Sequence, residues 1–196
     1  MSDSREHILN TTFKLFLKKS FKEVTMKEIV EATGLSKGAF YHYFESKEQL
    51  FSEVIEHFYA PFMNIDFDRF SHESLKKFYK EFLKGLLQKA EEMDKSVDLM
   101  DANVYFLIFD AMKILPGFKK LIDAQQKTEL QGWLKIVQMA RKSGEINPTM
   151  TDVQIAQFFI YSNDGVGIRL MLDGRMDDMA QELEKLWDGF YKQLKR

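Results

Sequence analysis

The sequence feature that most constrains the fold is a run of helix start and stop signals within residues 24–50. Thr25 and Ser46 each precede a glutamate or glutamine by three positions, which is the spacing of a capping box at a helix N-terminus. Ser36 is a further N-cap, and it follows Gly34, a residue that tolerates the positive φ found just past a helix C-terminus. Two short helices must therefore meet at a tight turn, and four helices are predicted within about the first sixty residues.

Apolar residues at helical spacing predict helices in the remaining sequence as well. The chain has 10 Gly and 3 Pro, too few for an all-β fold, which would need a turn at every ~10 residues. We therefore expect an all-α protein. In the N-terminal part, we expect a helix over 3–20, two short helices on either side of Gly34, and a helix that begins at Ser46 and ends at Pro61. After a connection over 62–70, we expect helices over Leu75 to Leu87, 99–115, 118–142, 152–172 and 175–194.

Composition excludes several classes of protein. With 28 Lys and Arg against 30 Asp and Glu, the net charge is −2, so a nucleic acid or an anionic membrane would need a local basic patch. The absence of Cys fits a reducing compartment. Charged residues such as Asp3 and Arg5 open the chain, and its longest apolar stretch, 104–109, is far shorter than the ~20 residues of a membrane span. We expect no membrane partner, no export signal and a cytoplasmic location.

The sequence carries no motif that is typical of an enzyme or a cofactor site. Neither a Gly-x-Ser-x-Gly nucleophile motif nor a phosphate-binding loop is present. Gly165 and Gly167 resemble the start of a dinucleotide motif, but no strand precedes them. We therefore expect a protein that is not an enzyme and that has no cofactor or metal. The histidines also lack the spacing of metal-ligand pairs: they are His7, His42, His57 and His72.

The two short helices around Gly34 form a helix-turn-helix pattern, in which the second helix lies in the DNA major groove. Residues 14–47 contain seven Lys and four Glu, an excess of three positive charges in a chain that is otherwise acidic. Neutralisation of phosphates by such residues supplies the sequence-independent part of DNA affinity. The pattern and the local charge together predict a DNA-binding segment.

Helical spacing assigns roles within the second short helix. Phe40 and Phe44 lie four positions apart and should point into the core, which leaves Lys37, Tyr41 and His42 facing outward. Taken singly, each outward residue has a purely structural explanation, for example a half-buried aromatic ring or a solvated charge. Their combination with three N-caps and a glycine turn favours the DNA-binding interpretation.

Three further residues fit DNA contact. Gly38 lowers helix propensity by ~1 kcal/mol relative to Ala, a cost that close approach to a DNA strand could offset, although a fraying first turn is the simpler alternative. Thr25 and Lys47 both lie at helix N-termini, where free N–H groups and the helix dipole favour a phosphate. Two helix starts are thus expected to hold one DNA backbone.

The segments 25–29, 32–38 and 41–44, with Lys47, Leu50 and Phe51, resemble the tetracycline-repressor (TetR) family of transcriptional regulators. This resemblance covers about fifty residues, and the later helices match the family in number, length and order. It implies an all-helical homodimer with a three-helix DNA-binding domain over 1–46, joined by a fourth helix to a ligand-binding and dimerisation domain within 47–196.

The resemblance also implies a set of DNA contacts. Tyr41 and Lys47 would hold phosphates, while Lys37 and His42 would reach base edges or phosphates. The sequence departs from the common family pattern at Ala39, where a hydroxyl side chain often stands, and at Val30, where Ala is usual. The full set of expected DNA-binding residues is Thr25, Ser36, Lys37, Gly38, Tyr41, His42 and Lys47.

The C-terminal part offers weaker signals for a ligand. Its Phe and Met residues, part of 18 and 11 in the chain, favour an apolar or amphipathic ligand but equally suit a plain core. Polar residues inside apolar helical runs, together with one tryptophan, are better candidates because buried polar groups need partners. These candidate ligand-binding residues are Asn103, Asp110, Trp133, Asn163 and Asp164.

The two helices of 152–194 carry more apolar surface than one chain can bury, so they are expected to form a four-helix bundle with a second copy. We therefore interpret the chain as a repressor that binds a pseudo-palindromic DNA operator as a dimer and is released by an unknown small molecule. The alternatives are a helical interaction scaffold that does not bind DNA and a regulator without a small-molecule inducer.

Overall fold

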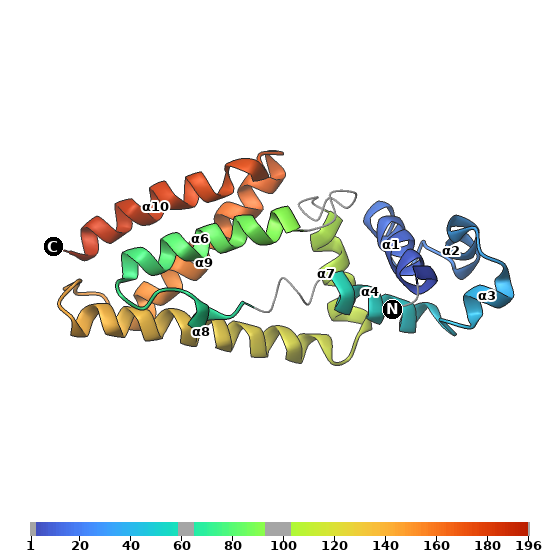
Figure 1. The fold of residues 1–196 in the computed structure, drawn as a ribbon, viewed down its shortest axis with the longest axis horizontal. Helices are drawn as coiled ribbons and strands as arrows, with labels where there is room; N and C mark the ends of the chain where they lie inside the picture. The colour runs from blue at the N-terminus through green and yellow to red at the C-terminus, as the bar shows by residue number, and fades with distance from the viewer. Residues whose placement is uncertain (1–2, 59–64, 93–102, 196) are drawn as a thin grey trace. The chain divides into compact units, whose positions relative to one another are not determined.

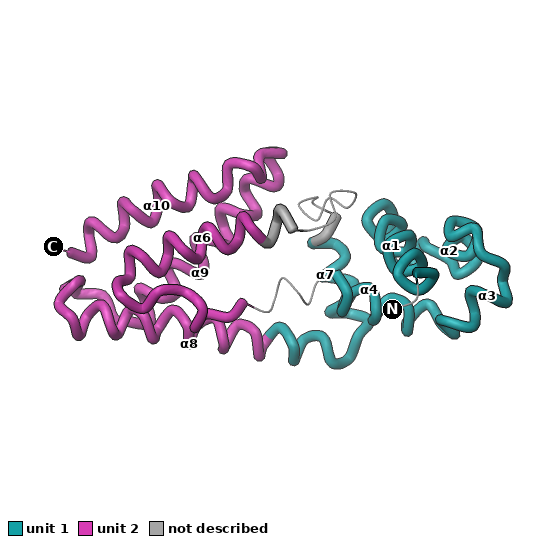
Figure 2. The backbone as a smooth tube through the Cα atoms, in the orientation of Figure 1, with its two compact units in different colours: residues 1–64, 97–122 teal, residues 65–96, 123–196 magenta. Residues whose placement is uncertain are grey.

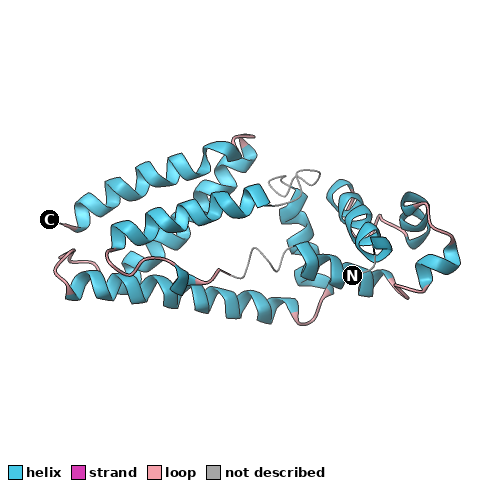
Figure 3. Ribbon diagram, viewed as in Figure 1, coloured by secondary structure: helices cyan, strands magenta, loops and turns pink. Residues whose placement is uncertain are grey.

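The computed structural model describes residues 3–58, 65–92 and 103–195, and within these ranges the regular structure is entirely helical (Figures 1 and 3). The expected all-α fold is confirmed. By packing, the chain divides into two compact units, one of residues 1–64 and 97–122 and the other of residues 65–96 and 123–196 (Figure 2). Among the described residues, none of the helices combines the length and the apolar character needed to cross a membrane.

The first unit is built from α1 (Asp3–Lys18), α2 (Met26–Thr33), α3 (Lys37–Tyr41), α4 (Lys47–Phe58) and α7 (Asn103–Ile114). Its core is rich in aromatic side chains: Phe13 stacks on Phe58 with ring centroids 4.2 Å apart, and Phe16 meets Phe51 edge to face at 5.0 Å. These pairs join α1 to α4. The packing therefore places α4 and α7 with the N-terminal helices, whereas the functional boundary expected after residue 46 stays a prediction.

The caps around α2 and α3 confirm most of the local signals. The Thr25 hydroxyl accepts a hydrogen bond from the N–H of Glu28, the Ser36 hydroxyl accepts one from Ala39, and Gly34 has a φ of +68°. The Glu28 carboxylate also accepts a hydrogen bond from Lys19 Nζ at 2.5 Å, and this bond, together with a weaker contribution from the backbone N–H of Thr25, lowers the pKa of Glu28.

The second unit contains α6 (Leu75–Glu92), the greater part of α8 (Phe118–Lys142), α9 (Asp152–Leu172) and α10 (Met179–Leu194). Its core surrounds Trp133 and Trp187, whose rings meet edge to face at 5.5 Å. A Cβ atom at Gly132 would lie 2.4 Å from Phe67 Cγ, so only glycine allows this approach between α8 and η1 (Phe67–Arg69).

Most helix bounds agree with the sequence-based expectation to within a few residues. The bounds expected for 118–142 and 152–172 are those found. The first helix ends at Lys18 rather than at residue 20, and the last begins with a short 3-10 turn, η2 (Met176–Asp178), before α10. In the helix expected over 99–115, residues 99–102 lie outside the described residues, and α7 covers the rest to Ile114.

Candidate functional site

The turn between α2 and α3 presents α3 at the surface of the first unit. Phe40 and Phe44 are fully buried and anchor α3 in the core, as their spacing predicted. Tyr41 and His42 between them are exposed, as is the N-cap Ser36, whereas Tyr43 is half-buried. A short helix whose one face is anchored in the core by two phenylalanines and whose other face is exposed can enter a groove of a partner.

The exposed side of α3 carries a cation and an aromatic ring that contact each other. Lys37 Nζ lies 5.9 Å from the centroid of the Tyr41 ring, which is the range of a cation–π contact. Next to them, His42 is exposed, and its backbone N–H caps α3 by donating to the carbonyls of Gly38 and Phe40. The surface therefore offers hydrogen-bond donors of the kinds that phosphates and base edges accept.

Gly38 has no packing role inside the chain. A Cβ atom at this position would meet nothing within 4 Å, and the backbone does not have a positive φ. Neither internal crowding nor backbone strain explains a glycine in this helix. The open space is available to a molecule that approaches from outside.

Lys47 has an internal contact that the sequence did not reveal. Its ammonium group donates to the carbonyl oxygens of Phe21 and Val24, both at 2.8 Å, and lies 4.2 Å from the centroid of the Phe21 ring. The side chain thus ties the start of α4 to the loop between α1 and α2. Two of the three ammonium hydrogens are used in this way, which leaves one for a phosphate.

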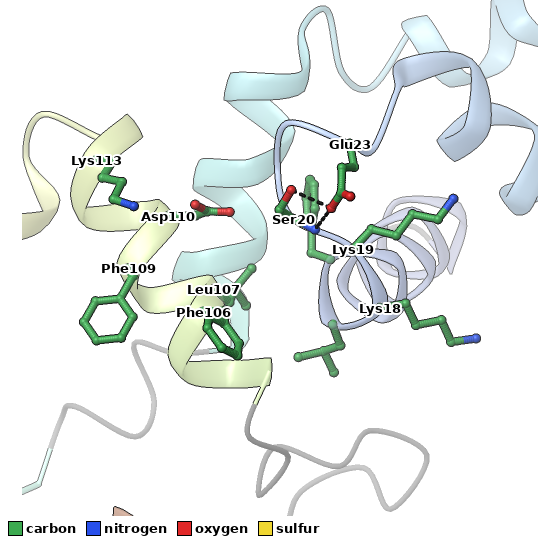
Figure 4. A pocket seen from close by; sticks show the side chains of 11 residues that line it. Lys18, Lys19, Ser20, Glu23, Phe106, Leu107, Phe109, Asp110 and Lys113 are labelled. Atoms are coloured by element: carbon green, nitrogen blue, oxygen red, sulfur yellow. Dashed lines mark hydrogen bonds between the residues drawn. The ribbon is translucent and has the colours of Figure 1, made fainter.

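The same loop is held from its other side by Asp110 of α7. The backbone N–H of Phe21 donates to Asp110 Oδ2 at 2.9 Å. Within the loop, the Ser20 N–H and hydroxyl donate to Glu23 Oε2, and these bonds lower the pKa of Glu23 (Figure 4). Phe21 is therefore fixed through both its N–H and its carbonyl group.

Asp110 also lines a surface pocket of about 430 Å³ between the end of α1 and α7 (Figure 4). Lys18, Lys19 and Lys113 contribute to its lining, as do the exposed rings of Phe106 and Phe109. The structure thus places Asp110 in the first unit, apart in the packing from the candidate ligand residues of the second unit. Asn103 begins α7, and its side chain lies outside the described residues.

The remaining ligand candidates lie on α8 and α9, which run antiparallel. The Trp133 ring stacks on Phe159 at 4.6 Å, and Arg141 pairs with Asp152 at 2.7 Å, so the two helices are paired in opposite directions. One helical turn from the stacked rings, this register brings residue 129 of α8 opposite Asn163 of α9. Asn163 therefore lies about one helical turn from Trp133, and Asp164 beside it is exposed.

Glu129 joins these residues, although the sequence analysis did not select it. Burial and, to a smaller extent, the neighbouring carboxylate of Asp164 together raise the pKa of Glu129 to about 7. Burial also raises the pKa of Asp164, while a hydrogen bond from the Asn163 side chain acts in the opposite direction. The signal that could have found Glu129 is its position four residues before Trp133, on the same face of α8.

Comparisons with known proteins agree with the DNA-binding geometry. The family described as "Bacterial regulatory proteins, tetR family" matches residues 8–54, which include α2 and α3. YerO of Bacillus subtilis (strain 168), an HTH-type transcriptional regulator, is 42% identical over 64 residues that span 33% of this chain and 22% of that protein. KstR2 of Mycolicibacterium smegmatis, an HTH-type transcriptional repressor, is 26% identical over 173 residues that span 84% of this chain and 78% of that protein.

A solved structure extends the likeness to the remaining helices. The crystal structure of Escherichia coli NemR in its reduced form has a TM-score of 0.59 at 19% sequence identity, over 95% of this chain and 97% of that chain. At this identity the likeness concerns the fold. The match over residues 8–54 identifies a TetR-family helix-turn-helix segment, and the curated relatives and solved structures together support a TetR-family transcriptional regulator.

Proposed function

We propose that the protein is a repressor that binds a pseudo-palindromic operator as a homodimer and is released by a small molecule. The observation that carries this proposal is the exposed side of α3, which presents Lys37, Tyr41 and His42 around a glycine that internal packing does not require. Two such helices in a dimer would enter successive major grooves about 34 to 36 Å apart. Regulators of this family bind operators as dimers and often bind small-molecule ligands.

The proposed DNA contacts divide into two classes. Thr25, Ser36 and Tyr41 have backbone N–H groups or hydroxyls suited to phosphates, and Lys47 retains one free donor for the same purpose. Lys37, Gly38 and His42 lie on the side of α3 that would face the base edges. The first class supplies affinity for any sequence, and the second class supplies discrimination.

The helices of 152–194 supply the proposed dimer interface. Along α9, the exposed apolar side chains of Val153, Tyr161, Ile168 and Leu172 follow helical spacing, and Tyr161 and Leu172 are 63% and 71% exposed. Such a stripe is too apolar for a solvated helix face. A second copy related by a two-fold axis would cover it and complete a four-helix bundle.

A ligand can release the protein from DNA only if it has a higher affinity for the conformation that does not bind the operator than for the conformation that does. The polar residues near Trp133 are the proposed site, since Trp133 Nε1 and Asn163 Oδ1 are buried without a hydrogen-bond partner among the described residues. A ligand that satisfied both atoms would stabilise the conformation in which it fits. DNA binding and its release would take place in the cytoplasm.

The decisive test is binding of the purified protein to DNA flanking its own gene and to unrelated duplex, at several salt concentrations. We expect saturable binding of two or more chains to a pseudo-palindrome, and weaker, strongly salt-dependent binding to unrelated DNA. Equal, weak binding to both duplexes would overturn the proposal and favour a helical interaction scaffold.

A further inference from the structure

The pocket between the end of α1 and α7 is a cavity that the proposed function does not use (Figure 4). Its volume of about 430 Å³ lies within the range of small-molecule sites, about 300 to 1,000 Å³. Its lining residues all belong to the first unit and to the described parts of the chain. There is therefore room for a small ligand in the unit that carries the candidate DNA interface.

The apolar part of the lining is partly open to solvent. Phe106 and Phe109 of α7 are 66% and 53% exposed, and Leu17 of α1 is half-buried. Leu107 and Phe16, which also line the pocket, are buried in the core of the unit. Neighbouring aromatic rings that stay exposed on a folded surface mark an interaction site. A ligand with an aromatic body would remove these rings from water and gain the apolar contact.

The two carboxylates of the lining already have hydrogen-bond donors within the chain. Asp110 accepts from the backbone N–H of Phe21 at 2.9 Å. Glu23 accepts from the backbone N–H of Ser20 at 2.9 Å and from its hydroxyl at 2.7 Å, and these bonds lower the pKa of Glu23. Both carboxylates are thus held in place by the loop after α1, and neither needs a cation from outside for this.

The lysines of the lining differ in their partners. Lys19 donates to Glu28 Oε1 at 2.5 Å, whereas Lys18 and Lys113 form no ion pair with any described residue. Both of these lysines are exposed, and each ammonium group ends a flexible four-carbon stem that can turn toward a bound anion. The polar groups of the pocket that lack a partner are therefore cationic donors, which pair with a carboxylate.

We propose that this pocket binds a small carboxylate with an aromatic body. The ammonium groups of Lys113 and Lys18 pair with the carboxylate, and the ring packs against Phe106. The site goes beyond the proposed function, because these three side chains belong neither to the proposed DNA contacts nor to the candidate ligand residues near Trp133.

A ligand in this pocket would touch the loop that the DNA-binding helices depend on. Ser20 and Asp110 line the pocket, Asp110 holds the N–H of Phe21, and Lys47, a proposed phosphate contact, holds the carbonyl group of Phe21. The bound anion also adds negative charge to the unit that would meet DNA phosphates. We therefore expect the carboxylate to lower the affinity for the operator, and DNA to lower the affinity for the carboxylate. This linkage rests on the proposed function, whereas binding of the carboxylate does not.

The test is calorimetric titration of the full chain, without DNA and at low salt, with 3-phenylpropanoate, 3-phenylpropan-1-ol, 3-phenylpropan-1-amine and acetate. We expect the aromatic carboxylate to bind at one site per chain, and the alcohol to bind about fivefold more weakly because exposed ion pairs are modest in strength. Acetate, which has no ring, should give no measurable binding. High salt should weaken the carboxylate but not the alcohol. Equal binding of the alcohol, tighter binding of the amine, or no binding of the carboxylate at millimolar concentration would overturn the proposal.

Variants test whether the ligand lies in this pocket. Lys113→Gln should weaken the carboxylate about threefold and leave the alcohol unchanged, whereas Phe106→Ser should weaken both about fivefold. Lys120→Gln is the matched control, because Lys120 is an exposed lysine of α8 that does not line the pocket. All three positions are exposed, so the thermal midpoints should stay close to that of the wild type. If Lys113→Gln and Lys18→Gln both kept full affinity, or if Lys120→Gln lost as much, the assignment would be wrong.

The outcomes are distinguishable from failure of the proposed function. Carboxylate binding is measured without an operator, so it does not depend on DNA recognition. A protein that binds the carboxylate with the expected dependence on Lys113 but keeps its operator affinity when saturated retains the site and loses the linkage. A protein that binds its operator but no carboxylate keeps the proposed repressor function and loses this site.

Discussion

Replacing Glu129 with glutamine should remove a large part of the pH dependence of stability in the second unit. The pKa of Glu129 is about 7 in the folded chain, against 4.5 for an ordinary glutamate. In the unfolded chain this carboxyl group loses its proton near pH 4.5, whereas the folded chain retains it until about pH 7. The folded state therefore binds more protons between these values, and its stability falls as pH rises through this window.

The size of the effect follows from the difference between the two pKa values. At about 1.4 kcal/mol for each pH unit, the difference between 4.5 and about 7 corresponds to about 3 kcal/mol. Because the Glu129 side chain is only partly buried, solvent screens part of this, and we expect about 1 to 3 kcal/mol. Glu129→Gln cannot ionise, so the variant should match the wild type near pH 4.5 and exceed it by this amount at pH 8.

Urea unfolding followed by tryptophan fluorescence measures this difference. The chain has two Trp residues, Trp133 and Trp187, and both lie in the core of the second unit, so the signal reports the unit that contains Glu129. Both proteins are compared at one chain concentration, since dimerisation adds to apparent stability. Ionisable groups that do not interact with Glu129 contribute equally to both proteins, so they cancel in the comparison.

The result that would refute the reasoning is specific. If the free energies of unfolding of the two proteins ran parallel from pH 4.5 to pH 8, Glu129 would have its ordinary pKa, and the burial of its carboxyl group would be without consequence. A variant less stable than the wild type at pH 8 would show instead that the Glu129 carboxylate has a favourable partner.

Three further predictions concern DNA binding and assembly. Lys47→Met, which keeps the apolar stem, should lower the free energy of unfolding of the first unit by about 1 to 3 kcal/mol in thermal unfolding and weaken binding to every duplex. An unfolding midpoint equal to that of the wild type would show that the hydrogen bonds from Lys47 to the loop do not stabilise the unit. Lys37→Ala should reduce the base preference at one operator position by ~1 to 3 kcal/mol when affinities for single-base variants are measured. Tyr41→Phe should weaken binding to all DNA sequences equally. If Lys37→Ala also weakened binding to all sequences equally, Lys37 would be a phosphate contact. Tyr161→Glu should shift the protein to monomers in analytical ultracentrifugation, whereas the control Lys127→Glu, at an exposed position on α8, should not. If the Tyr161 variant remained a dimer, the dimer interface would lie elsewhere.

The parts of the fold that were predictable depend on near neighbours in the sequence. The caps at Thr25 and Ser36 and the turn at Gly34 involve groups within three positions, so the sequence pattern specifies them directly. The burial of Phe40 and Phe44 follows from helical spacing in the same way. These local features position α3, which is why the candidate DNA interface could be predicted from the sequence.

The contacts that could not be predicted join residues far apart in the chain. Lys47 donates to a carbonyl 26 positions away, and Asp110 accepts from an N–H 89 positions away. Helical periodicity indicates that such a side chain lies on an apolar face, but it does not say which backbone group meets it. Glu129 was missed for a related reason: its environment is set by α9, and the register between the two helices is a property of the folded unit.

The double attachment of Phe21 has a consequence for how the DNA-binding module can be separated from the rest of the chain. A fragment that ends at residue 46 would lack both Lys47 and Asp110, so the N–H and carbonyl groups of Phe21 would lose their partners together. It would also lack Phe51, against which Phe16 and Phe21 pack. The helix-turn-helix is therefore not a self-sufficient cassette, and domain exchange between relatives should carry α4 and α7 along with it.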